Sequence, residues 1–234
     1  MDKLRQELST LHIEKALDIA TRDGAFAKEM YAGFGSCKEI VALDRSDKMF
    51  EKGREKCAGM LVNFVIGDAC HMDFEDNTFD VVGIGNSLHH IPDLAALLAE
   101  MKRVVKPGGL IILSEMYNDG QPKASLTHWI LHDIDCTMHT IDGIYHHPTY
   151  SKSEILWLAR NAGLTVEKTL CDLIDDPKVV AKLRERIAAV PENLKKYESN
   201  PAHAFLAAEA AWLNEEYEAN GVTSAEQLVA FCRK

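Results

Sequence analysis

The 234-residue chain lacks the features that would place it in a membrane, in a secretion route or on a nucleic acid. No apolar run approaches the roughly 20 residues that a membrane-spanning helix needs, and the first seven residues do not resemble a signal peptide. No cluster of Lys and Arg is visible, and the net charge of −10 repels phosphate backbones. These absences predict a cytoplasmic protein with no membrane and no nucleic-acid partner.

The cysteines also lack the spacing of a metal or disulfide motif. None of the six forms a CxxC pair, and they stand at positions 37, 57, 70, 136, 171 and 232. In a reducing compartment such residues are mostly buried or inert thiols. The alternative is a trio that binds a soft metalloid.

Short apolar segments alternate with helical segments along most of the chain. Each of the first five apolar segments is apolar on both sides, as expected when helices cover both faces of a parallel sheet, whereas 164–173 alternates like a strand. Right-handed crossovers then give a doubly wound sheet. The expected strands are 15–20, 39–44, 62–66, 80–85, 110–115, 164–173 and 227–232. The expected helices are 3–12, 25–34, 46–53, 92–105 and 151–162, and residues 106–109 are expected to form a turn that enters the fifth strand.

Two stretches, about 117–148 and 176–225, are expected to be helical insertions, after the fifth strand and between the sixth and seventh. No repeat or low-complexity linker sets them apart, and the length suits one domain with insertions better than two. We therefore expect a single α/β domain over 1–234, with the insertions forming a lid, a substrate region or an oligomer face. The acidic face of 203–219 would suit a homodimer, although such charge is more often a solvated face.

Polar motifs follow the expected strands in a fixed order. They are Asp18-Ile19-Ala20-Thr21-Arg22-Asp23-Gly24, Asp44, Gly67-Asp68-Ala69, Asn86-Ser87-Leu88-His89-His90-Ile91 and Lys106-Pro107-Gly108-Gly109. This order resembles class I S-adenosylmethionine (SAM) dependent methyltransferases, in the broad group that contains the ubiquinone- and menaquinone-type enzymes. The resemblance covers residues 12–115 well, 150–172 moderately and the insertions hardly at all. It implies a Rossmann-like, seven-stranded, mostly parallel sheet that binds SAM and releases S-adenosylhomocysteine.

The first turn departs from the family pattern Asp-x-Gly-x-Gly-x-Gly. Asp18 and Gly24 match it, but Ala20 and Arg22 replace the first two glycines. Alanine is a mild change, whereas Arg22 puts a bulky cation where the backbone normally approaches the ligand. This arginine would either pair with the carboxylate of the cofactor's methionine part or lie solvated on an altered turn.

An acidic residue ends the second expected strand, as in many nucleotide-binding folds. Asp44 could accept hydrogen bonds from both ribose hydroxyls, and Arg45 directly follows it as a further cofactor-binding candidate. The same spacing would suit NAD, but the first turn lacks the dinucleotide glycine pattern.

The resemblance assigns the remaining cofactor contacts. It implies that Asp68 and Ala69 lie at the adenine, with Met49 on the adenine face. It also implies that Asn86 and Ser87 follow the fourth strand near the reactive end of SAM. The histidine pair that comes next is expected to be structural or to line the cofactor pocket.

The segment 128–147 is the main indication of acceptor chemistry. His128 and His132 are four residues apart and so share a helix face, as do Asp135 and His139. Such a pair can chelate a metal, supply a general base near neutral pH or belong to a polar interdomain or dimer face. We take these four as candidate catalytic residues and predict no metal-ligand set.

A motif that the chain lacks indicates the class of methyl acceptor. No Asn/Asp-Pro-Pro-Tyr/Phe tetrad follows the fourth strand, where amino-methylating nucleic-acid enzymes carry one. Together with the acidic charge, this favours a SAM-dependent methyltransferase that acts on a small molecule. Two alternatives remain: a SAM-binding enzyme with metal-assisted or non-methylating chemistry, and a non-catalytic binding protein on a methyltransferase fold.

Overall fold

The computed structural model describes residues 1–234 and separates into two compact units. The sheet unit consists of Met1–Glu115, Lys152–Asp172 and Leu228–Lys234. The helical unit consists of Met116–Ser151 and Leu173–Gln227. None of the helices combines the length and the apolar character that crossing a bilayer requires.

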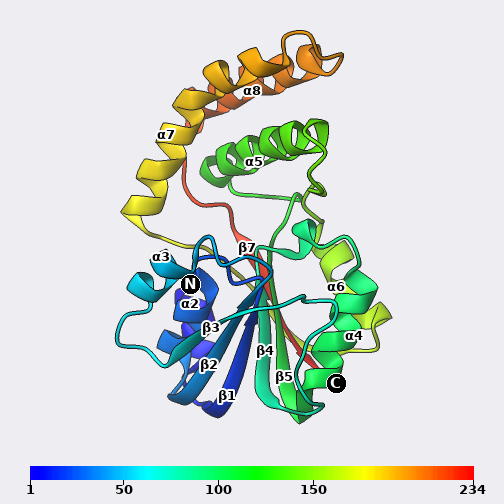
Figure 1. The fold of residues 1–234 in the computed structure, drawn as a ribbon. Coiled ribbons are helices and arrows are strands. Elements are labelled where there is room, and N and C mark those ends of the chain that lie inside the picture. Colours follow the sequence, from blue (N-terminus) through cyan, green and yellow to red (C-terminus); the bar gives the residue numbers. More distant parts are fainter. The chain divides into compact units, whose positions relative to one another are not determined.

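A seven-stranded sheet with the order β3-β2-β1-β4-β5-β7-β6 forms the centre of the sheet unit (Figure 1). β1 pairs in parallel with β2 and β4, β2 with β3, and β4 with β5. The strands are β1 (His12–Ile19), β2 (Ser36–Asp44), β3 (Val62–Ile66), β4 (Phe79–Gly85), β5 (Val105–Met116), β6 (Thr165–Asp172) and β7 (Gln227–Arg233). The strand order reverses between β1 and β4, which confirms the predicted doubly wound α/β class.

Helices cover both faces of this sheet, with α2 and α3 on one side and α4 and α6 on the other (Figure 1). The helices of the sheet unit are α1 (Asp2–Leu8), α2 (Ala25–Gly33), α3 (Phe50–Lys56), α4 (Leu94–Val104) and α6 (Lys152–Asn161), with a 3-10 turn, η1 (Leu88–His90). Consecutive residues of the central strands are buried, such as Val81, Val82 and Ile111. This burial on both faces explains why the strands are continuously apolar in the sequence.

The first and third helices are shorter than the sequence indicates. The first ends at Leu8, four residues earlier than expected, because Ser9 closes its last turn by donating its hydroxyl to the Gln6 carbonyl at 2.7 Å. The third begins at Phe50, four residues later than expected. The preceding residues form a turn that the Asp44 carboxylate organises instead of a helical turn.

The fifth strand begins before the motif that was expected to lead into it. Val105 already pairs with Phe79, and Leu110 pairs with Val81. Residues 106–109 are therefore a bulge inside β5 and not a turn before it. Gly108, with φ of +74°, supplies the left-handed backbone that the bulge needs.

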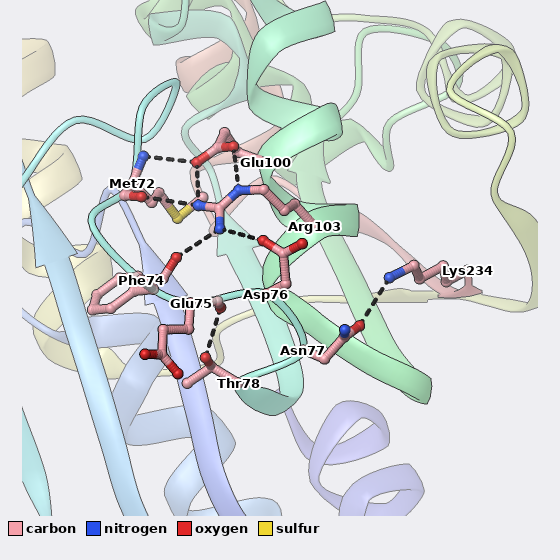
Figure 2. A network of polar contacts seen from close by, with 9 residues as sticks. All are labelled: Met72, Phe74, Glu75, Asp76, Asn77, Thr78, Glu100, Arg103 and Lys234. Atoms are coloured by element: carbon pink, nitrogen blue, oxygen red, sulfur yellow. Dashed lines mark hydrogen bonds and ion pairs between the residues drawn. The ribbon is translucent and has the colours of Figure 1, made fainter.

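Arg103, near the end of α4, holds the long connection between β3 and β4 (Figure 2). Its Nε and Nη2 donate to the two carboxylate oxygens of Glu100 at 2.7 and 2.8 Å. Nη1 donates to the Phe74 carbonyl at 2.6 Å and to Asp76 at 2.9 Å, and Nη2 also donates to the Met72 carbonyl at 2.9 Å. All five N–H donors of the guanidinium are thus used, so one side chain fixes the connection at several points.

We expect Arg103→Lys to lower the free energy of unfolding by about 3 kcal/mol, because an ammonium group cannot reach these acceptors in the same geometry. Urea unfolding measures the change. Arg54→Lys is the control, since the Arg54 guanidinium lies over the Phe50 and Phe64 rings, 5.9 and 6.0 Å from their centroids. Equal unfolding midpoints for Arg103→Lys and the wild type would contradict this assignment.

The helical unit packs three helices around an apolar core of its own. They are α5 (Lys123–Ile141), α7 (Pro177–Leu194) and α8 (His203–Asn220). The most buried residues of this core are Ile130, Leu131, Ile134, Leu183, Ile187, Val190, Leu206 and Leu213. The stretch expected to be helical over 176–219 is interrupted after α7 by the 3-10 turn η2 (Lys195–Tyr197) and by a turn at Pro201, which lacks an amide hydrogen.

Candidate cofactor site

The turn after β1 keeps a glycine-type backbone although two glycines of the family pattern are replaced. Ala20 and Arg22 have φ of 53° and 51°, and Gly24 has φ of 70°. A non-glycine residue in this left-handed region costs about 1–2 kcal/mol. The turn is held by the Thr21 N–H, which donates to the Leu43 carbonyl at 2.9 Å, and by the Gly24 N–H, which donates to the Thr21 carbonyl at 2.8 Å. These contacts impose a strained conformation on residues 20 and 22.

Gly24 is the position in this turn where a side chain is sterically excluded. A Cβ atom there would lie 2.8 Å from the Phe64 ring and 3.0 Å from the Cys57 sulfur. The side chains of Ala20 and Arg22, in contrast, line an open cavity. This difference explains why the glycine at 24 is retained while the other two positions accept side chains.

We expect Ala20→Gly to raise the free energy of unfolding by about 1 kcal/mol, because glycine relieves the left-handed strain at φ of 53°. Ala32→Gly, on the exposed side of α2, is the matched control and should lose about 1 kcal/mol through helix propensity. Denaturant unfolding of both variants measures the two shifts. The strain is refuted if Ala20→Gly also destabilises the protein.

Asp18 lies fully buried beneath this turn. Its Oδ2 accepts hydrogen bonds from the Thr21 hydroxyl and from the Ala27 N–H, the latter at 3.0 Å, while its Oδ1 has no hydrogen-bond partner. Burial raises the pKa of Asp18 to about 7, against the lowering effect of the hydrogen bonds from Thr21 and Ala27. The buried Asp18 carboxyl group is therefore only partly ionised near neutral pH.

A cavity of about 280 Å³ opens beside the turn, at the carboxyl ends of the strands. Asp44, at the end of β2, lines it. The Asp44 Oδ2 accepts the Arg22 N–H at 2.8 Å, and its Oδ1 accepts the Ser46 N–H at 3.1 Å. Each carboxylate oxygen keeps a second lone pair, so Asp44 can also accept hydrogen bonds from two neighbouring hydroxyl groups of a ligand.

The loop after β3 forms another wall of this cavity. Asp68, whose side chain is 64% exposed, accepts the Cys70 N–H at 2.8 Å. At Gly67 a Cβ atom would lie 2.6 Å from Leu43 Cδ1, so glycine lets this loop approach β2 closely. With the apolar side chain of Ile91, the cavity combines acidic groups with apolar surface, as small-molecule sites generally do.

Seven of the eleven predicted cofactor residues line the cavity. They are Ala20, Arg22, Asp44, Arg45, Asp68, Ala69 and Ser87. The other four, Asp18, Gly24, Met49 and Asn86, are not part of its lining. Met49 directly precedes α3, and the Asn86 N–H donates to the Ser114 carbonyl at 2.7 Å.

Six further lining residues were not among these eleven, although His90 belongs to the histidine pair that was expected to be structural or to line the cofactor pocket. They are Leu43, Gly67, Cys70, His90, Ile91 and Pro92. Each stands within, or directly beside, a motif that was recognised. The sequence signal therefore pointed to the loops that form the cavity but did not show which residues of each loop line it.

His89 and Glu115 form a buried pair after β4 and in β5. The His89 Nδ1 lies 2.7 Å from Glu115 Oε1, and the Glu115 Oε2 accepts the Leu88 N–H at 2.7 Å. The two residues are 2% and 0% exposed. The carboxylate fixes the ring orientation and favours the tautomer with hydrogen on Nδ1. Of the histidine pair, His90 lines the cavity while His89 faces this carboxylate.

Two of the four candidate catalytic residues meet in the helical unit, and both contact His146. The His139 Nδ1 lies 2.8 Å from His146 Nδ1, and the His132 Nε2 lies 3.2 Å from His146 Nε2. His146 follows α5 in the sequence and lies within the segment 128–147, but it was not one of the four candidates. The structure thus makes it the residue that joins the other two.

The other two candidates are held in separate contacts. The His128 Nδ1 accepts the Ala225 N–H at 2.8 Å, and burial together with the nearby Arg186 cation lowers the pKa of His128 to about 4. Asp135 forms an ion pair with Arg186, which links α5 to α7. The helix-face pairs expected from the four-residue spacing are therefore not formed: the partners come from other segments.

Residues 17–113 match a family model described as a methyltransferase domain. These residues belong to that family. The demethylmenaquinone methyltransferase of Staphylococcus aureus strain MRSA252 is 43% identical over 102 residues, which cover 43% of this chain and 42% of that relative. The alignment thus spans less than half the length of the curated relative, and the predicted family is confirmed for this part of the chain.

Solved structures extend the likeness over the whole chain. A candidate methyltransferase from Bacillus halodurans C-125 has a TM-score of 0.66 at 23% identity, over 100% of this chain and 97% of that chain. The phosphoethanolamine N-methyltransferase 2 of Haemonchus contortus, bound to phosphomonomethylethanolamine and S-adenosylhomocysteine, has a TM-score of 0.57 at 16% identity, over 99% of this chain and 51% of that chain. At these identities the likeness establishes the fold.

Proposed function

We propose that this protein is a SAM-dependent methyltransferase that transfers a methyl group to a small-molecule acceptor. The observation that carries the proposal is the cavity at the carboxyl ends of the strands, which is lined by Asp44 at the end of β2. Asp44 lies in the part of the chain that belongs to the methyltransferase family. We also propose a cytoplasmic location and a single methyltransferase domain with helical insertions over residues 1–234.

The residues of the cavity suit SAM chemically. Asp44 offers lone pairs to the two ribose hydroxyls, and Asp68 with the apolar Ile91 suits a purine ring. Arg22 is a cation that lines the same cavity, and we propose that it pairs with the carboxylate of the methionine part. SAM, when bound, supplies an activated methyl group, so the protein mainly has to align the acceptor.

We propose that the helical unit recognises the acceptor, because it lies outside the part of the chain that matches the family. His132 is our candidate for the residue that activates the acceptor, supported by its contact with His146 and by the contact of His146 with His139. His128 and Asp135 then serve to fix α5 through Ala225 and Arg186. The S. aureus relative methylates demethylmenaquinone by name, but the shared part is the cofactor half.

Calorimetric titration with SAM and with S-adenosylhomocysteine tests the cofactor part of the proposal. Binding of both at micromolar concentration supports it and shows that the turn with Ala20 and Arg22 is functional. No binding of either would contradict it and favour a binding protein without methyl transfer. Incubation with SAM and a panel of quinols, amines and thiols, followed by mass spectrometry, then identifies a methylated product.

A further inference from the structure

A cluster of three imidazoles lies in the helical unit, with His146 at its centre. His146 is 6% exposed. Its backbone carbonyl accepts hydrogen bonds from Cys136 Sγ at 3.0 Å and from the Thr140 hydroxyl at 3.5 Å, both from α5. The segment after α5 is therefore anchored so that the His146 ring contacts His132 and His139, which are on that helix.

The two ring contacts of His146 have different geometries. With His139 the nitrogens are 2.8 Å apart and the ring centroids 5.0 Å apart. With His132 the nitrogens are farther apart, at 3.2 Å, but the centroids are closer, at 4.8 Å, and the ring planes are nearly perpendicular at 88°. The contact with His139 is thus close to a straight hydrogen bond, whereas the contact with His132 is bent and weak as a hydrogen bond.

We infer that the Nε2 atoms of His132 and His146 are two ligands of a divalent transition-metal ion of the zinc class. Imidazole nitrogens bind zinc at about 2.0–2.1 Å, and two of them on a tetrahedral ion lie about 3.4 Å apart, close to the 3.2 Å found here. Imidazole donors suit zinc, copper, iron and nickel, whereas magnesium and calcium take oxygen ligands.

His139 completes the arrangement as a supporting residue and not as a ligand. When Nε2 of His146 holds an ion, the ring hydrogen is on Nδ1 and is donated to Nδ1 of His139 at 2.8 Å. Metal-binding histidines generally donate their second ring nitrogen to an acceptor in this way, which fixes the tautomer and the ring orientation. The contact of His146 with His139 thus fixes the His146 ring, whereas the contact of His146 with His132 brings together the two nitrogens that bind the ion.

Two other potential ligands in α5 are engaged elsewhere. The Cys136 Sγ donates to the His146 backbone carbonyl at 3.0 Å. His128, four residues before His132, accepts the Ala225 N–H through Nδ1. The inferred chelate therefore joins α5 to the segment after it, and it leaves coordination positions open for water or another donor.

Titration of the metal-stripped, full-length protein with Co²⁺, followed by visible absorption and by competition with Zn²⁺, tests the inference. We expect one site of micromolar or tighter affinity, weakened at least tenfold in both His132→Gln and His146→Gln. His147→Gln is the matched control, since His147 is an exposed neighbour whose Nδ1 contacts the Pro148 carbonyl at 2.6 Å. It should keep wild-type affinity.

Wild-type protein that binds no Co²⁺ at micromolar concentration would overturn the inference, and so would unchanged affinity in the variants of His132 and His146. Circular dichroism checks folding, and His132→Asn provides a second variant at a half-buried position if His146→Gln fails to fold. The titration uses neither SAM nor an acceptor. Its failure would therefore leave the proposed methyl transfer untouched, and a failure of SAM binding would leave the metal site untouched.

Discussion

Replacement of Asp44 by alanine is expected to weaken SAM binding at least tenfold. The carboxylate stands at the end of β2 in the cavity, where it can accept hydrogen bonds from both ribose hydroxyls, and hydrogen bonds to a charged group contribute about 1.5–3 kcal/mol each. It also accepts the N–H groups of Arg22 and Ser46 at 2.8 and 3.1 Å. The substitution therefore removes a ligand contact and loosens the turn that carries Arg22.

Calorimetric titration of Asp44→Ala with SAM measures the loss, and two further variants separate its parts. Ser46→Ala keeps the backbone N–H that Asp44 accepts and should bind SAM like the wild type. Asp44→Asn keeps one acceptor oxygen but turns an N–H donor toward one of the two backbone amides, so its affinity should fall between the two. If Asp44→Ala bound SAM as tightly as the wild type, Asp44 would not be a cofactor contact.

Asp18→Asn is expected to stabilise the protein at pH 8 and to leave its stability at pH 5 nearly unchanged. Burial raises the pKa of Asp18 to about 7 from an ordinary value of 3.8. Between these two values the folded state binds more protons than the unfolded state, so the free energy of unfolding falls as pH rises. The contribution is fully present below pH 3.8 and is lost above pH 7, a difference of about 4 kcal/mol.

Asparagine abolishes this slope because it carries no charge, but its amide nitrogen occupies the place of the unpartnered Oδ1 and costs about 1–3 kcal/mol. We therefore expect a net gain of about 2 kcal/mol at pH 8. Urea unfolding at pH 5 and pH 8 measures it. Asp80→Asn is a control for which the stability change should have the opposite sign. Burial raises the pKa of Asp80, but the hydrogen bond from Lys106 and further contacts lower it, and the net pKa is lowered. The Asp80→Asn variant should therefore lose stability at pH 8. Parallel pH profiles for Asp18→Asn and the wild type would refute the raised pKa.

The order of the elements could be predicted from the sequence because it depends on short-range patterns. Each central strand of the sheet, β1, β2, β4 and β5, has a continuous apolar segment, since both of its faces are buried. The loops at the carboxyl ends of the strands were recognised from Asp44, Asp68 and the motif around Ser87, which all line the cavity. In the sheet unit the errors lay at ends of elements, such as the start of β5 at Val105, where pairing with β4 overrides the turn character of the next four residues.

The site in the helical unit was less predictable, because a helical spacing only shows which residues could meet. His128 and His132 share the spacing of a chelating pair, yet His128 contacts Ala225, which is 97 residues away in the sequence. His132 instead meets His146, which reaches it because the chain turns at Gly143 after α5, with φ of +76°. Neither partner could be identified without the packing of the segments.

Three features are properties of neighbouring residues and could be predicted without the fold: the alternation of strands and helices, the acidic ends of the strands, and the departure at Ala20 and Arg22. Tertiary packing keeps both replaced positions in the left-handed backbone, because the turn donates hydrogen bonds to β2, at the Leu43 carbonyl and the Asp44 carboxylate. It also decided the raised pKa of Asp18 and the meeting of His132 with His146. Burial and contact between distant segments arise only when the chain packs, and local periodicity does not contain them.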